Sequence, residues 1–239
     1  MTPLELLAAT LAITVGSVVQ AASGVGAGFL IVPLLAWINL GLVPAPMIFS
    51  SLALSGLMAW QERGDIDREH LAPIFIGLVP GSTLGAWIIS TLPAEQLGLV
   101  FAVVLLLAIA LTVIGLDIPL SKMSAVIAGG VAGAMGASTG IGAPVLALLF
   151  QHASGPRVRA TLALIYTVAS ALILMVLALF GRFGATEASA GALMMPGFLA
   201  GYWIANRLRH RLDQGATRPA VLIVSAAASI ALLVRSLGS

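Results

Sequence analysis

Apolar runs dominate this chain, and charges or turn residues interrupt them at intervals that fit membrane-crossing helices. Ten apolar segments lie between these interruptions, five in each half of the chain. They cover residues 4–22, 25–40, 44–60, 71–91 and 96–116, then 122–138, 140–151, 158–181, 188–206 and 218–236. Most reach the length of about 20 residues that a helix needs to cross a bilayer. The second segment of each half is shorter and follows the first without a polar loop, so each half predicts a broken helix or a hairpin with its tip at membrane depth.

A glycine-rich motif occurs at both of these interruptions. The letters SGVGAG at 23–28 correspond to TGIGAP at 139–144, 116 positions later, and PGSTLGAWI at 80–88 corresponds to PGFLAGYWI at 196–204 at the same separation. The pattern predicts an all-α polytopic membrane protein of two repeats, 1–118 and 119–239, with about five segments each and eight to ten in all. An odd number of segments per repeat would place the two repeats in inverted orientations.

Composition supports this class and excludes several others. The chain is 60% hydrophobic and 8% charged, with a mean hydropathy of +1.11, whereas soluble domains carry roughly 25% charged residues. A net charge of +2 spread over loops provides no basic patch for nucleic acid. The absence of cysteine excludes disulfides and thiol chemistry, and three isolated histidines have no metal-ligand spacing. We therefore expect no metal, no cofactor and no enzymatic activity.

The distribution of lysine and arginine predicts the orientation. If ten segments alternate across the membrane, nine of the eleven basic residues fall on one side. That side receives Arg63, Arg68, Lys122, Arg157, Arg159, Arg207, Arg209, Arg211 and Arg218, and the other receives Arg182 and Arg235. Counting each broken pair as one crossing would divide the charges six to five, so the uneven division favours five segments per repeat. The basic loops are then cytoplasmic and both termini periplasmic.

The glycines at the two interruptions are the first candidates for a substrate site. Glycine is a poor helix former, and backbone N–H and C=O groups that it exposes at membrane depth need protein, water or a ligand as partners. Free N–H groups at the start of a helix favour anions. The candidates are Gly24, Gly26, Gly28, Gly140 and Gly142. The alternative is close packing of helices, since small residues at a spacing of four are typical of membrane interfaces.

Polar side chains near the interruptions extend the predicted site. They are Gln20, Ser23, Ser138 and Thr139, with Ser51 and Thr161 one segment later and Arg159 at the mouth of the eighth segment. Membrane serine and threonine hydroxyls also bond to their own helix backbone, which is the alternative for each of them. Arg157 and Arg159 stand at the mouth of the eighth segment, where they could either collect anions or anchor the topology. We find no ionisable side chain deep in a segment, which argues against a proton relay and leaves His152 as the remaining candidate.

These motifs, in this order and spacing, resemble the sulfite exporter TauE/SafE family, also called the toluene sulfonate uptake permease family. The resemblance rests on residues 24–33, 136–144 and 159–163 and on the two Pro-Gly segments, and it covers nearly the whole chain. It implies a transporter of the bacterial inner membrane for small sulfur-containing anions such as sulfite, sulfonates or sulfoacetate. Family members often carry glycine where this chain has Ala27 and Ala143, and the extra methyl groups would narrow the site. An inside-negative potential would drive an anion outward, so we expect export.

Several functional alternatives stay open at this point. One is uptake of a small anion coupled to H⁺ or Na⁺. Another is a membrane partner protein with no transport of its own. A membrane enzyme would need paired carboxylates or a metal cluster near the interface, and the acidic loop at 62–69 is the sole place for one. Its interleaved arginines indicate a solvated, salt-bridged loop instead. The expected partners are a small anionic substrate and the lipid bilayer, and the sequence leaves open whether the unit is a monomer or a homodimer.

Overall fold

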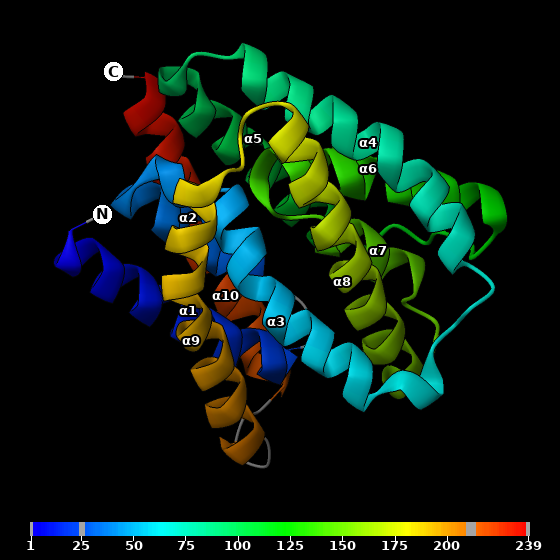
Figure 1. Cartoon of the computed structure of the whole chain (residues 1–239). Helices are drawn as coiled ribbons and strands as arrows, with labels where there is room; N and C mark the ends of the chain where they lie inside the picture. The colour runs from blue at the N-terminus through cyan, green and yellow to red at the C-terminus, as the bar shows by residue number, and fades with distance from the viewer. Residues whose placement is uncertain (1, 24–26, 209–213, 238–239) are drawn as a thin grey trace.

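The structure is a computed structural model that describes residues 2–23, 27–208 and 214–237 of the chain. Within these residues it contains ten α-helices, two 3₁₀ turns and no strand (Figure 1). The helices are α1 (Pro3–Ser23), α2 (Ala27–Ile38), α3 (Ala45–Gln61), α4 (Leu71–Thr91), α5 (Ala94–Ile114), α6 (Lys122–Thr139), α7 (Ala143–Leu149), α8 (Gly155–Leu179), α9 (Ala185–Leu208) and α10 (Gln214–Leu237). The 3₁₀ turns η1 (Leu40–Leu42) and η2 (Arg63–Asp65) precede and follow α3.

The all-α prediction is confirmed, and each predicted segment corresponds to one helix. Among the described residues, five helical spans are long and apolar enough to cross a membrane by length and composition, and these are η1 with α3, then α4, α5, α8 and α9. The starts of α8, α9 and α10 lie three or four residues before the predicted ones. The seventh segment, predicted over 140–151, forms a helix of only seven residues. Its shortness follows from the glycines before it and the polar turn after it.

Two ends of the helical assembly can be recognised from contacts between loops. At one end, the Tyr202 hydroxyl on α9 donates to Gln61 Oε1 on α3 at 2.9 Å. Arg159 at the start of α8 contacts Glu62, which follows α3. We call this the basic end, because it also carries Arg63, Arg68, Arg157 and Arg207. At the opposite end, Arg182 after α8 donates to the Ile89 carbonyl near the end of α4.

Two pairs of helices run in the same direction and are in close contact through glycines. In the α4–α6 pair, an added Cβ at Gly77, Gly81 or Gly85 would overlap backbone atoms of α6. The glycines therefore set the backbone-to-backbone spacing of α4 and α6. In the α1–α9 pair, Gly197 and Gly201 approach backbone and side-chain atoms of α1 in the same manner. The two Pro-Gly segments thus serve packing, and their prolines lie inside continuous helices.

The four tryptophans divide between the two ends, and all are exposed. Trp60 near the end of α3 and Trp203 near the end of α9 lie toward the basic end. The Arg207 guanidinium stacks 3.7 Å from the centre of the Trp203 ring, and Arg63 lies 5.8 Å from that of Trp60. Trp37 and Trp87 end α2 and α4 toward the opposite end. Exposed tryptophans in two groups are typical of the two interfaces of a membrane protein.

Candidate functional site

The second glycine motif separates α6 from α7. Gly140 adopts a left-handed conformation, with φ +81°, and its N–H bonds to the Gly136 carbonyl at 2.7 Å, which ends α6. A side chain is strained at this φ, so glycine suits the position. Pro144 then occupies the first turn of α7, where its missing N–H does no harm. At the first motif, α1 ends at Ser23 and α2 begins at Ala27. Gly24 and Gly26, and the side chains of Gln20 and Ser23, lie outside what the structure describes.

The two helix pairs enter the molecule from opposite ends. α6 runs parallel to α4, which starts at the basic end, and α7 returns there, since His152 after α7 bonds to Asp117 before α6 at 2.8 Å. α1 runs parallel to α9, which ends at the basic end, so α1 starts at the opposite end. α2 returns to that end, where Trp37 stacks 5.2 Å from the Arg235 guanidinium at the end of α10. The two pairs therefore enter from opposite ends, and the α6–α7 pair has its turn directed into the molecule.

The start of α2 meets the turn between α6 and α7 inside the protein. A Cβ added to Gly28, in the first turn of α2, would lie 3.2 Å from Cγ1 of Ile141, which stands between the two glycines of the second motif. The Ile141 side chain is 2% exposed. An added Cβ at Gly140 would meet the thioether end of Met47 on α3. Residues 113 positions apart thus come together where the two repeated motifs converge.

The hydroxyls near this convergence are occupied by their own helices. Ser138 donates to the Ala134 carbonyl at 2.7 Å, and Thr139 donates to the Met135 carbonyl at 2.7 Å. Ser51 on α3 donates to the Ile48 carbonyl at 2.9 Å. The backbone-bonding alternative therefore describes all three in this conformation.

Two further polar and glycine positions complete the surroundings of the turns. Ser17 on α1 differs from the other hydroxyls, since its Oγ is buried and has no partner among the described residues. Gly142 serves close packing, because its added Cβ would lie 2.6 Å from the Ala132 carbonyl oxygen.

Two predicted site residues lie elsewhere. Arg159 and Thr161 belong to the first turns of α8 at the basic end, whereas Gly28 and Gly140 lie at the meeting turns. The Arg159 Nε donates to Glu62 Oε1 at 3.3 Å. The fully buried Thr161 Oγ1 accepts from the Asp67 N–H at 2.9 Å. The predicted set therefore separates into a group at the turns and a group at the basic end.

Asp67 is the residue that the sequence interpretation missed. Its side chain is 1% exposed, although the 62–69 loop was expected to be solvated. Its carboxylate lies 3.0 Å from an Arg157 guanidinium nitrogen and 3.3 Å from His70 Nδ1. Burial raises the pKa of Asp67, but the hydrogen bonds from His70 and the Glu69 N–H, with the Arg157 charge, outweigh burial and hold the pKa below its usual range. The i, i+3 spacing of Asp67 and His70 was the only local signal.

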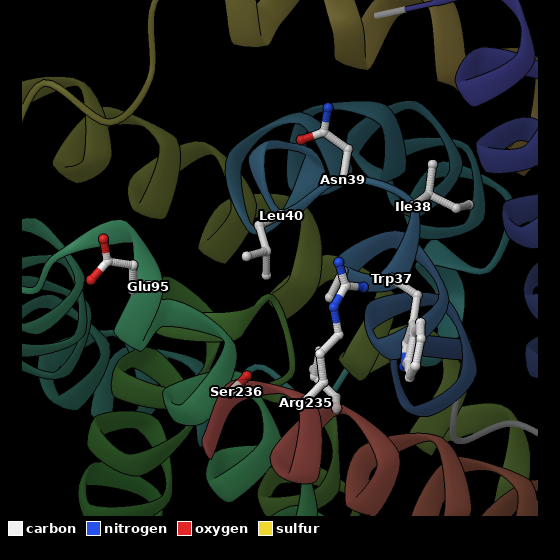
Figure 2. A pocket seen from close by; sticks show the side chains of 9 residues that line it. Trp37, Ile38, Asn39, Leu40, Glu95, Arg235 and Ser236 are labelled. Carbon is white, nitrogen blue, oxygen red and sulfur yellow. The ribbon is translucent and has the colours of Figure 1, made fainter. Parts of the chain in front are cut away.

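A hollow of about 270 Å³ lies at the opposite end, between the ends of α2 and α10 and the start of α5 (Figure 2). Arg235 and Trp37 lie together on one side of it and Glu95 lies across from them (Figure 2). None of the predicted site residues lines this hollow. In the described part of the chain, no group of three or more His, Asp or Glu residues could hold a metal ion.

Ten helices, five of them long enough to span a bilayer, and exposed tryptophans at both ends define a polytopic membrane protein. A family model described as Sulfite exporter TauE/SafE matches residues 8–232, nearly the whole chain. The protein therefore belongs to the TauE/SafE sulfite exporter family, and the resemblance noted in the sequence is confirmed. This is a family of transporters, which indicates a membrane transporter of sulfur-containing anions. No curated protein and no solved structure matches the chain.

Proposed function

We propose that this protein exports a small sulfur oxyanion of the sulfite, sulfonate or sulfoacetate class, and that the anion binds where the two glycine turns meet. The observation that carries this proposal is the contact between Gly28 and Ile141, which joins the two copies of the motif. Backbone groups at helix breaks are tolerated inside a membrane where they line a site, and paired breaks are typical of transporter binding sites. The site is then formed by residues 20–28 of one turn and 138–142 of the other.

The arrangement of helices supports two inverted repeats, 1–118 and 119–239. If α1 to α5 correspond to α6 to α10, contacts in one repeat should have counterparts in the other. The α4–α6 pair corresponds to the α9–α1 pair, and both pairs are parallel. The α1–α2 contact corresponds to α6–α7, and the α2–α10 contact to α7–α5. An axis in the membrane plane relates such repeats, and rocking them around a central site would expose it to each side in turn.

The direction follows from charge and membrane potential. We place the basic end in the cytoplasm and both termini in the periplasm of the bacterial inner membrane, because cytoplasmic loops carry the excess of lysine and arginine. Each negative charge that leaves the cell then gains about 2.3 kcal/mol per 100 mV of inside-negative potential. A doubly charged anion therefore needs no coupling ion to move outward.

Thermal stabilisation in detergent tests this function. Sulfite, sulfate, sulfoacetate, taurine, acetate and chloride would each be titrated, since a ligand that binds only the folded protein raises its stability. We expect selective stabilisation by one sulfur oxyanion, and its loss in Gly28→Val, whose side chain would press on Cγ1 of the Ile141 side chain. Gly56→Val is the matched control, because the nearest atom to its added Cβ is 3.9 Å away on Thr167. An unchanged anion response in folded Gly28→Val would contradict the site.

One observation favours a second candidate, uptake of an anion coupled to protons. The sequence offered no buried acid, but Asp67 is a buried carboxylate in contact with a histidine. Carboxylate and histidine side chains form the proton relays of pumps and transporters when they lie within spanning segments, and Asp67 lies in a loop directly beside them. Flux into proteoliposomes separates the candidates: voltage alone should drive export, whereas coupled uptake requires an imposed pH gradient. A protein that carries no anion in either assay would be a membrane partner protein instead.

A further inference from the structure

Two arginines at the start of α8 are held by two carboxylates of the α3–α4 loop. Arg157 contacts Asp67 at 3.0 Å and Arg159 contacts Glu62 at 3.3 Å. We propose that Arg157, Arg159 and Thr161 form an anion-access site at the basic end, which the protein's own Asp67 and Glu62 occupy in this conformation. This inference rests on the proposed anion transport, and it concerns a site separate from the glycine turns.

The arginine side of this site has the chemistry of an oxyanion receptor. A guanidinium presents several N–H donors and binds carboxylate, sulfonate and sulfite oxygens by the same charge-assisted hydrogen bonds. Arg157 and Thr161 are four residues apart and share one face of α8. The Thr161 hydroxyl accepts from the Asp67 N–H, and no described residue accepts its proton. It can therefore still donate to an oxyanion that takes the place of the carboxylate.

The carboxylate side of this site is incompletely bonded. Glu62 Oε1 accepts from Arg159, but Glu62 Oε2 is buried and has no partner among the described residues. A buried charged oxygen without a hydrogen bond is unfavourable, so its release from this position is favoured. The 62–70 loop thus holds α8 through one well-bonded contact, that of Asp67, and one poorly bonded contact, that of Glu62. An arriving anion competes first with Glu62 and then with Asp67.

Displacement of the two carboxylates would separate the α3–α4 loop from α8. Asp67 and Glu62 make the ion pairs found between this loop and α8 in the described chain. Once an anion holds the arginines, the loop is free to move away from the start of α8 and open the basic end. The same residues therefore bind the anion and control its access to the interior.

Comparison of Asp67→Asn with Asp117→Asn tests this inference. Both changes remove one negative charge at the basic end, but Asp117 contacts His152 and neither arginine. The response is the sulfite concentration that gives half of the maximal thermal stabilisation. For Asp67→Asn we expect this concentration to fall about threefold to tenfold, because a competitor for Arg157 is gone. For Asp117→Asn we expect no change.

A purely structural role of Asp67 predicts a different result. The melting temperature of Asp67→Asn would fall, and its sulfite dependence would equal that of the wild type, which would overturn the proposal. If Asp67→Asn does not fold, Glu62→Gln replaces it in the test. The Glu62 side chain is 30% exposed, so removal of its charge should destabilise the folded protein less. We expect the same fall in the sulfite concentration that gives half of the maximal stabilisation, and the absence of this fall overturns the proposal.

Cysteine labelling gives a second readout and separates this inference from the proposed function. The chain contains no cysteine, so Ile165→Cys, one turn beyond Thr161 and fully buried, provides a single reporter. We expect Glu62→Gln and added sulfite each to increase its labelling by a polar thiol reagent, and an unchanged rate contradicts the opening. If sulfite changes the labelling but the protein carries no sulfite flux, the access site is retained and the transport proposal is refuted.

Discussion

Two neighbouring glycines on α6 should respond in opposite ways to the same substitution. An added Cβ at Gly129 would lie 2.9 Å from the Ile74 carbonyl carbon on α4 and closer still to its oxygen. An added Cβ at Gly130 would have one neighbour, the Gly77 carbonyl oxygen, at an ordinary distance of 3.6 Å. Gly129→Ala therefore requires α4 and α6 to separate, because backbone atoms cannot turn aside as a side chain can. Gly130→Ala requires no movement.

The magnitudes follow from packing and helix propensity. Overpacking typically costs about 1–3 kcal/mol, and alanine recovers up to about 1 kcal/mol of helix propensity relative to glycine. We therefore expect Gly129→Ala to lower the free energy of unfolding by about 1–2 kcal/mol. Gly130→Ala should leave it unchanged or raise it by up to about 1 kcal/mol. For a chain of this size, each kcal/mol corresponds to roughly 2–4 °C of melting temperature. The two variants should then differ by about 2–12 °C in melting temperature.

Thermal unfolding in one detergent, followed by tryptophan fluorescence and by the size-exclusion profile after heating, measures this difference. Both variants carry the same change of one methyl group on the same helix, so each is the control for the other. Equal melting temperatures would refute the packing described for α4 and α6. A loss of stability in Gly130→Ala alone would refute the orientation of α6, in which Gly129 and not Gly130 faces the α4 backbone.

Two further predictions concern charge and membrane position. Because the folded state holds the pKa of Asp67 below its usual range, the stability gained over Asp67→Asn is present above the unfolded pKa of about 3.9 and is lost as the pH falls through the lower pKa of the folded state. The difference in melting temperature between the wild type and Asp67→Asn should therefore narrow as the pH falls below about 3.9, and a constant difference there would contradict the ion pair. In single-tryptophan variants that retain Trp37, Trp60, Trp87 or Trp203, lipid-borne quenchers near the headgroups should quench more than quenchers at the chain ends, and the reverse order would exclude the interfacial placement.

Local sequence patterns were sufficient to predict the helices and the interruption before α7. Long apolar runs in a chain of low charge can satisfy their backbone groups only as helices. The sequence around Gly140 specifies a helix end and the start of another, since a glycine that permits a left-handed conformation is followed closely by a proline suited to a first turn. Such signals are local, so they can be recognised without knowledge of the neighbouring helices.

Contacts between distant segments could not be predicted from the same patterns. The sequence placed Thr161 one segment after the glycine motifs and Arg159 at the mouth of the eighth segment, but it did not reveal that both contact the α3–α4 loop. Asp67 was assigned to a solvated loop because an acidic residue among arginines usually is solvated. Its burial depends on Arg157, 90 positions away, and only the packing of α3 against α8 brings the two together.

The two kinds of contact in this protein differ in what they permit. Along α4 and α6 the glycines bring backbone atoms so close that neither helix can slide without a clash, so this pair moves as one body. The contacts of Asp67 and Glu62 with α8 are ion pairs between mobile side chains, and one carboxylate oxygen is unbonded. Water or an anion can take the place of one partner in such an ion pair, whereas neither can substitute for the close packing of two helix backbones. A conformational change that exposes the glycine turns at the basic end is therefore expected to break the ion pairs and to leave the α4–α6 pair intact.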